Sequence, residues 1–183
     1  MTNAEMLFEM IQLQKAYDQA VYEEFETEYD ETKTRLALLD EIGETNHELK
    51  SLWCWWKKTQ KPVDWDKALE ELADCWHFVL SIYYHNIEDW YGRMEWAKIS
   101  DECIALFKEN RMMFNCIWAM DFRPDRMKLL LECMEDITGG YNALRIVNSL
   151  INLTLCLGFD FEEIYEAYKE KNKVNYERLK NGY

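Results

Sequence analysis

The chain has 183 residues, of which 49% are hydrophobic and 15% aromatic, and its formal net charge is −14 at pH 7. This composition excludes a disordered chain and suffices for one folded domain with a core. The negative charge argues against a nucleic-acid-binding protein, because phosphate backbones attract basic surfaces. Only two prolines and six glycines interrupt the chain, which favours long helices. We therefore predict an all-α helical bundle, with residues 1–183 as a single domain.

The cysteines and the apolar runs indicate where the protein resides. Six cysteines are scattered without a C-x-x-C pair, as is typical of reduced thiols. The start, MTNAEMLFEM, lacks the basic and apolar regions of a signal peptide. No apolar run reaches the roughly 20 residues that a membrane span requires. We expect a cytoplasmic protein without a membrane partner.

Hydrophobic residues recur at helical spacing through most of the chain. The predicted helices cover approximately 3–29, 31–58, 64–84, 90–111, 122–134, 141–157 and 160 to the C-terminal residues. Gly158 is expected to end the sixth of these helices, and Asp160 with Glu163 forms a capping-box pattern that begins the last. The segment 87–140 shows no spacing that indicates chemistry, so we expect it to serve in packing or dimer contact.

Two acidic pairs, Glu41-x-x-Glu44 and Glu71-x-x-Asp74, lie on consecutive predicted helices. A spacing of three places both members of a pair on one helix face. A turn near Pro62 would fold the two helices back on each other, so that the four carboxylates face one space. Such a group requires cations, and Mg²⁺ prefers oxygen ligands together with substrate phosphates. The pattern predicts a Mg²⁺ site that cleaves a nucleoside triphosphate.

Other readings of these pairs stay open, because a chain with 35 acidic residues also places such pairs on solvent-exposed faces. Gly43, between the two glutamates of the first pair, costs about 1 kcal/mol relative to alanine in a helix. Close approach of a ligand or of a neighbouring helix is one reason to keep it. Gln14 and Asp18 lie one turn apart beside an apolar stripe, which is also typical of the polar shoulder of an amphipathic helix.

Near the C-terminus, Lys171, Asn175 and Arg178 share one helix face at offsets of four and three. A cation, an amide and a guanidinium suit a polyphosphate, although basic residues in a last helical turn also complement the helix dipole. No glycine-rich phosphate loop is present, which excludes a P-loop NTPase.

Several segments together resemble the dimeric all-α dUTPases, which are relatives of the MazG-type nucleotide pyrophosphohydrolases. The matching segments are Gln14-Lys15-Ala16-Tyr17-Asp18, Glu41-Ile42-Gly43-Glu44, Trp55-Trp56-Lys57-Lys58, Glu71-Leu72-Ala73-Asp74 with His77-Phe78, and Lys171-Asn172…Asn175…Arg178…Gly182-Tyr183. They follow the family order over nearly the whole chain, and segment 87–140 matches least. The chain is most similar to phage-borne forms from Gram-positive hosts.

The resemblance implies a homodimer that uses Mg²⁺ to hydrolyse dUTP to dUMP and pyrophosphate. In the family pattern, the metal ligands would be Glu41, Glu44, Glu71 and Asp74, with Glu44 orienting the attacking water. The β- and γ-phosphates would be held by Lys171, Asn175, Arg178 and Tyr183. The base and sugar would be held by Gln14, Asp18, Trp56 and Phe78. Phage enzymes of this family can also engage regulatory proteins, so such a partner is a further expectation.

Asp18 departs from the asparagine found in many members of the family. A carboxylate can accept the N3–H of uracil but would repel O4, whereas it accepts the amino group of cytosine well. A dCTP-cleaving enzyme is therefore an alternative, as is a pyrophosphohydrolase for another deoxynucleoside triphosphate. Comparing the turnover of dUTP and dCTP distinguishes the two.

Two alternatives come from other classes of protein. Glu44-x-x-His47 and Asp74-x-x-His77 have the acid-x-x-His spacing of di-iron carboxylate bundles. That reading lacks a clear source of further glutamates and leaves the C-terminal basic face without a role. A non-catalytic helical interaction protein, using its aromatic middle segment, is the second alternative.

Overall fold

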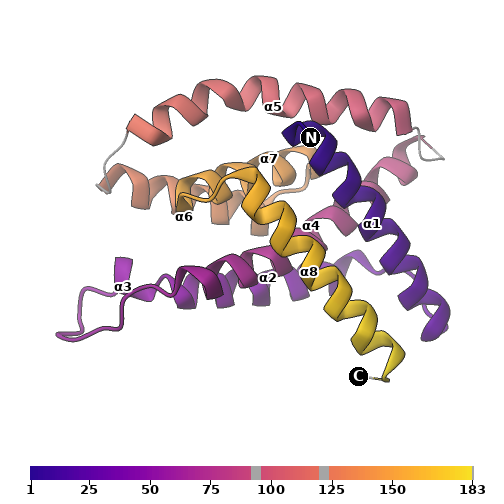
Figure 1. The fold of residues 1–183 in the computed structure, drawn as a ribbon, viewed down its shortest axis with the longest axis horizontal. Helices are drawn as coiled ribbons and strands as arrows, with labels where there is room; N and C mark the ends of the chain where they lie inside the picture. The colour runs from indigo at the N-terminus through magenta and orange to yellow at the C-terminus, as the bar shows by residue number, and fades with distance from the viewer. Residues whose placement is uncertain (92–95, 120–123, 183) are drawn as a thin grey trace.

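The structure is a computed structural model that describes residues 1–91, 96–119 and 124–182. Within these residues every regular element is an α-helix, which confirms the predicted all-α fold (Figure 1). The helices are α1 Asn3–Glu24, α2 Glu31–Glu48, α3 Lys50–Trp53, α4 Trp65–Tyr91, α5 Trp96–Ala119, α6 Pro124–Gly139, α7 Ala143–Leu157 and α8 Phe161–Lys180.

Helix α4 is the centre of the bundle, because α1, α2, α7 and α8 all pack against it. Its buried face continues into α7, which is buried at almost every position from Ile146 to Leu157. Trp76 is fully buried, and its indole N–H donates to the hydroxyl of Thr154 at 3.3 Å, joining α4 to α7. Helix α5 crosses α1 and α7 along one side of the bundle (Figure 1).

Side-chain hydrogen bonds cap the N-termini of the first two helices. Thr2 and Glu5 form a capping box at α1, and the Asp30 carboxylate accepts from the backbone N–H of Lys33 at α2. Helix α1 ends at Glu24, so its predicted extension to residue 29 is wrong. Glu26 has a φ of 49°, and this left-handed residue turns the chain toward the cap of α2.

The predicted single helix over 31–58 is also wrong, because α2 ends at Glu48. Leu49 turns into the core, where it is 2% exposed, and the short helix α3 follows. The indole N–H of Trp53 then donates to the carbonyl of Asn46 at 3.1 Å, which holds the folded-back turn. The connection to α4 leaves Trp55 88% exposed and Trp56 57% exposed.

The second half of the chain agrees more closely with prediction. Helix α4 continues to Tyr91, beyond the expected end near 84. Helices α5 and α6 overlap the segments 90–111 and 122–134, which were expected to be helical, with shifted bounds. Gly158 ends α7 with a φ of 96°, and Asp160 with Glu163 makes the expected capping box of α8.

No single helix among the described residues is long and apolar enough to span a membrane. The pair α7 and α8 meets the length and composition criteria only when taken together, and it is bent by 110° at the break between the two helices.

Candidate active site

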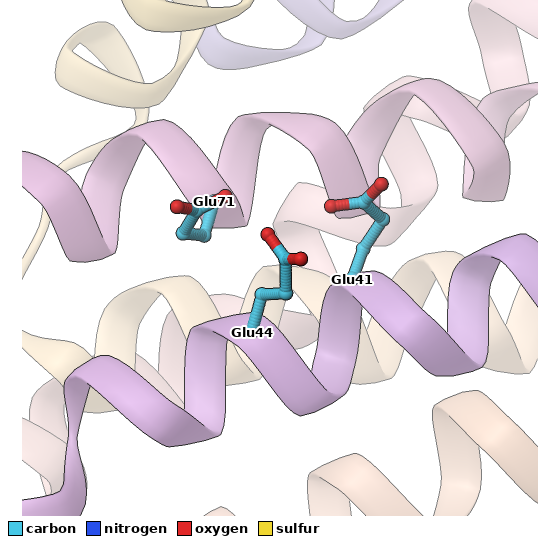
Figure 2. A group of neighbouring side chains, drawn as sticks. All are labelled: Glu41, Glu44 and Glu71. Atoms are coloured by element: carbon cyan, nitrogen blue, oxygen red, sulfur yellow. The ribbon is translucent and has the colours of Figure 1, made fainter.

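A cluster of three glutamates lies between α2 and α4. Oxygen atoms of Glu41, Glu44 and Glu71 all lie within 4.8 Å of one another. Figure 2 shows Glu41 and Glu44 on one helix and Glu71 on its neighbour, with the carboxylates turned toward the space between the helices. Helices α2 and α4 pack closely along their length, so the spacing of three within the first pair becomes a convergent group. We call these three residues the glutamate cluster.

Asp74, the fourth predicted metal ligand, is held beside this cluster by a cation. The Lys171 ammonium of α8 lies 2.7 Å from the Asp74 carboxylate and 3.2 Å from that of Glu70. Both members of the Lys171–Asp74 pair are largely shielded from solvent. Lys171 therefore neutralises Asp74 and fixes α8 against α4, next to the glutamates.

The carboxyl groups of Glu41, Glu71 and Asp74 have raised pKa values, as expected where negative charges crowd together. Burial, together with the neighbouring charges of Asp74, Glu44 and Glu71, raises the pKa of Glu41 to about 7. Burial and the adjacent carboxylates also raise the pKa of Glu71. Burial raises the pKa of Asp74 even though the hydrogen bond from Lys171 opposes it.

The donor set of the cluster fits a divalent cation. Within the described residues, none of the three glutamates has an ion pair of its own, and their carboxylates converge to within reach of one ion. Carboxylate oxygens are the ligands that Mg²⁺ takes in proteins, and a bound cation would relieve the repulsion that raises the pKa of Glu41. The histidines of the two acid-x-x-His motifs are not part of this cluster, so the geometry does not favour a di-iron centre.

A cavity of about 430 Å³ opens beside the cluster and is called the base cavity below. It joins residues predicted separately for three roles, and its lining includes Gln14, Asp18, Phe78, Asn175, Arg178, Glu41 and Asp74. The structure thus brings three of the four predicted base and sugar residues, two of the predicted phosphate residues and two of the predicted metal ligands to one space. Lys171, the third of the predicted phosphate residues on α8, does not line the cavity but forms an ion pair with Asp74, which does.

Gln14 is the best-connected side chain of the base cavity. Its amide N–H groups donate to the Asp18 carboxylate at 2.7 Å and to the Ser81 hydroxyl at 3.2 Å. Its carbonyl accepts from the Tyr168 hydroxyl at 2.9 Å and lies 2.7 Å from Nδ1 of His77. All four hydrogen-bonding positions of the amide are therefore in use, which fixes its orientation.

Asp18 is 7% exposed and accepts from three donors: Gln14, the Ser81 hydroxyl and the Tyr84 hydroxyl, the last at 2.9 Å. Burial nevertheless raises the pKa of Asp18 to about 6, because these hydrogen bonds only partly replace water. A carboxyl group with this pKa changes its donor and acceptor pattern near neutral pH.

His77 belongs to this hydrogen-bond network and is not a member of the glutamate cluster. Its ring stacks on Tyr168 with centroids 4.3 Å apart, and burial lowers the pKa of His77 to about 3. The ring is therefore neutral, and because Gln14 presents a carbonyl oxygen, Nδ1 carries the proton. His47, the other candidate histidine, lies toward the opposite end of the cluster, beside Glu48 and Lys67.

One predicted residue does not join this site, and another cannot be placed relative to it. Trp56 lies in the exposed connection after α3 and does not line the base cavity. Tyr183 lies outside the described residues. The prediction that a neighbouring helix approaches Gly43 is not supported, since a Cβ there would meet nothing within 4 Å.

Other residues of the base cavity were not predicted from sequence. They include Tyr17, Val21, Tyr22, Phe25, Thr34, Ser81 and Leu179. A signal existed for Ser81, because it follows Asp74 and His77 at offsets of seven and four on the same face of α4. Tyr17 follows Gln14 by three, and its ring meets that of Tyr176 at 5.1 Å.

The fold and the site together define a class: helical proteins in which carboxylates from two packed helices face a nucleotide-sized cavity. A family model described as dUTPase matches residues 6–183, almost the entire chain, and the chain therefore belongs to the dUTPase family. The comparison with individual curated proteins finds no match. The resemblance to the all-α dUTPases is confirmed, and the protein is an all-α dUTPase, an enzyme that hydrolyses dUTP.

Proposed function

We propose that this enzyme uses Mg²⁺ to hydrolyse dUTP to dUMP and pyrophosphate. The observation that carries the proposal is the convergence of Glu41, Glu44 and Glu71 to within 4.8 Å beside a nucleotide-sized cavity. In the part of the chain that the structure describes, none of the three forms an ion pair. Bound Mg²⁺ would supply charge stabilisation for the phosphoryl oxygens.

The roles of the side chains follow from their positions. Glu41, Glu44 and Glu71 would hold the metal. Asp74, which forms an ion pair with Lys171, would be the fourth carboxylate ligand. Glu44 is exposed and lies between the other two glutamates, so it is placed to orient an attacking water and accept its proton (Figure 2). Arg178 and Asn175 would hold the phosphates from α8.

The uracil would lie in the base cavity near Asp18 and Phe78. The fixed Gln14 amide holds Asp18 and Ser81 in place, so the polar edge of the base would meet a preorganised wall. Cleavage of dCTP is a second candidate, because Asp18 presents a carboxyl group that can accept the cytosine amino group.

The test is pyrophosphate release from a panel of dUTP, dCTP, dTTP and dATP with and without Mg²⁺. We expect release from dUTP that requires Mg²⁺ and falls by about 100-fold or more in Glu44→Gln, because this change removes a general base. Glu177→Gln, which alters an exposed glutamate of α8, is the matched control and should retain wild-type activity. Activity of Glu44→Gln equal to wild type would contradict the assignment.

We further propose that the enzyme acts as a homodimer in which Trp56 completes the site of the partner copy. The position of Trp56 supports this proposal. The resemblance implies that its indole contacts the nucleotide base, yet Trp56 is 57% exposed and does not line the base cavity of its own chain. Sedimentation analysis should give a dimer, and Trp56→Ala should raise the KM for dUTP. A monomer with full activity would contradict this arrangement.

A further inference from the structure

Two more cavities continue the groove between α2 and α4 beyond the glutamate cluster. The middle cavity, of about 380 Å³, is lined by Gly43, Glu44 and Glu71 and extends to His47, Glu48 and Lys67. The lysine cavity, of about 650 Å³, shares those last three residues and reaches the connection after α3. The base cavity lies at the other end, where Glu41 and Asp74 line it. The glutamate cluster therefore stands between the base cavity and the lysine cavity.

The lysine cavity concentrates positive charge on an acidic protein. Its lining includes four lysines, Lys50, Lys57, Lys61 and Lys67, but only two acidic residues, Glu48 and Asp64. Lys67 forms an ion pair with Glu48 at 2.9 Å. Among the described residues, Lys57 and Lys61 have no ion-pair partner, so their charges are available to an anion. The chain as a whole carries a net charge of −14, which makes this local excess of cations unusual for the protein.

The cations lie close to the carboxylates of the active site. Lys67 precedes Glu71 by one helical turn on α4, about 6 Å along the axis. The pKa of Lys67 is raised mainly by its hydrogen bond with Glu48, and also by the charges of Glu71 and Glu44. An anion that leaves the glutamate cluster through the middle cavity therefore meets Lys67 first and the exposed Lys61 beyond it.

We propose that the lysine cavity is a pyrophosphate-binding site that receives this product of the reaction. This proposal rests on the function proposed above. Hydrolysis breaks the anhydride link between the α- and β-phosphates. The oxygen of the attacking water joins one of these two phosphorus atoms, the bridging oxygen leaves on the other, and the water proton passes to Glu44. The pyrophosphate product carries several negative charges, which the lysines of this cavity attract.

The experiment is calorimetric titration of the full chain with inorganic pyrophosphate, without nucleotide and with EDTA to remove divalent metals. We expect wild-type binding that weakens about tenfold in Lys67→Met and by a smaller factor in Lys61→Met. Lys33→Met is the matched control, because Lys33 is also exposed and paired with one carboxylate, Asp30, but lies outside the cavity. It should bind as wild type does.

A thermal melt of each variant shows whether the loss of the Lys67–Glu48 ion pair affects folding, and Lys61→Met breaks no ion pair. Binding that survives both lysine variants but is lost in Arg178→Ala would assign pyrophosphate to α8 and overturn the proposal, as would no wild-type binding. Lysine-dependent binding in a protein that releases no pyrophosphate from dUTP would retain this site and reject the catalytic proposal.

Discussion

Glu41→Gln is expected to stabilise the metal-free enzyme at pH 8. The pKa of Glu41 rises from an ordinary value of 4.5 to about 7 in the folded protein, so the proton binds the folded state more tightly than the unfolded state. Stability therefore falls as the pH rises from about 4.5 to 7, and the full cost remains above pH 7. The difference corresponds to about 3 kcal/mol, which solvent screening at this half-buried site reduces to about 1–2 kcal/mol. Glutamine has no charge and removes this cost.

The assay is thermal unfolding in EDTA at pH 8 and pH 5, followed by addition of Mg²⁺. Glu41→Gln should raise the Tm at pH 8 by roughly 2–8 °C and change it much less at pH 5. Mg²⁺ should stabilise wild type at pH 8 but have little effect on the variant, because a cluster ligand is lost. Glu177→Gln should leave the Tm unchanged. A metal-free Glu41→Gln that is no more stable than wild type at pH 8 would refute the reasoning.

Two further substitutions test other parts of the site. Asp18→Asn should raise the ratio of kcat/KM for dUTP over dCTP by about tenfold, because the amide can donate to uracil O4; an unchanged ratio would show that Asp18 does not read the base. Gly43→Ala should add about 1 kcal/mol to the free energy of unfolding, since the new Cβ meets nothing within 4 Å. If the space beside Gly43 admits the substrate phosphates, the same variant should hydrolyse dUTP more slowly, and urea unfolding together with steady-state kinetics checks both effects.

Helix boundaries were predicted correctly from sequence where a local capping motif marks them. The capping box of Asp160 and Glu163 begins α8 as predicted, and Gly158 ends α7 because only a left-handed residue turns the chain there. The break after Glu48 was not predictable from periodicity, since the leucine and tryptophan pattern continues through the turn. Leu49 enters the core at that point, and only the packed structure shows this.

In the candidate site as well, contacts within one helix were predictable from sequence spacing, and contacts between helices distant in the chain were not. The spacing of three placed Glu41 beside Glu44, and the packing of α2 on α4 brought Glu71 to them. Spacing could not show that Lys171 would hold Asp74 from a helix about 100 residues away. Nor could it show that Gln14 and Asp18 share hydrogen bonds with Ser81, because such contacts depend on the crossing of α1 over α4.

The most direct test of the account is the position of a divalent cation in the enzyme. Crystals grown with Mn²⁺ in place of Mg²⁺ and a non-hydrolysable dUTP analogue would give an anomalous signal at each metal. The account predicts a peak bound by Glu41, Glu44 and Glu71, with metal–oxygen distances of about 2.1 Å. Full occupancy of the analogue with no peak at these three glutamates would contradict it.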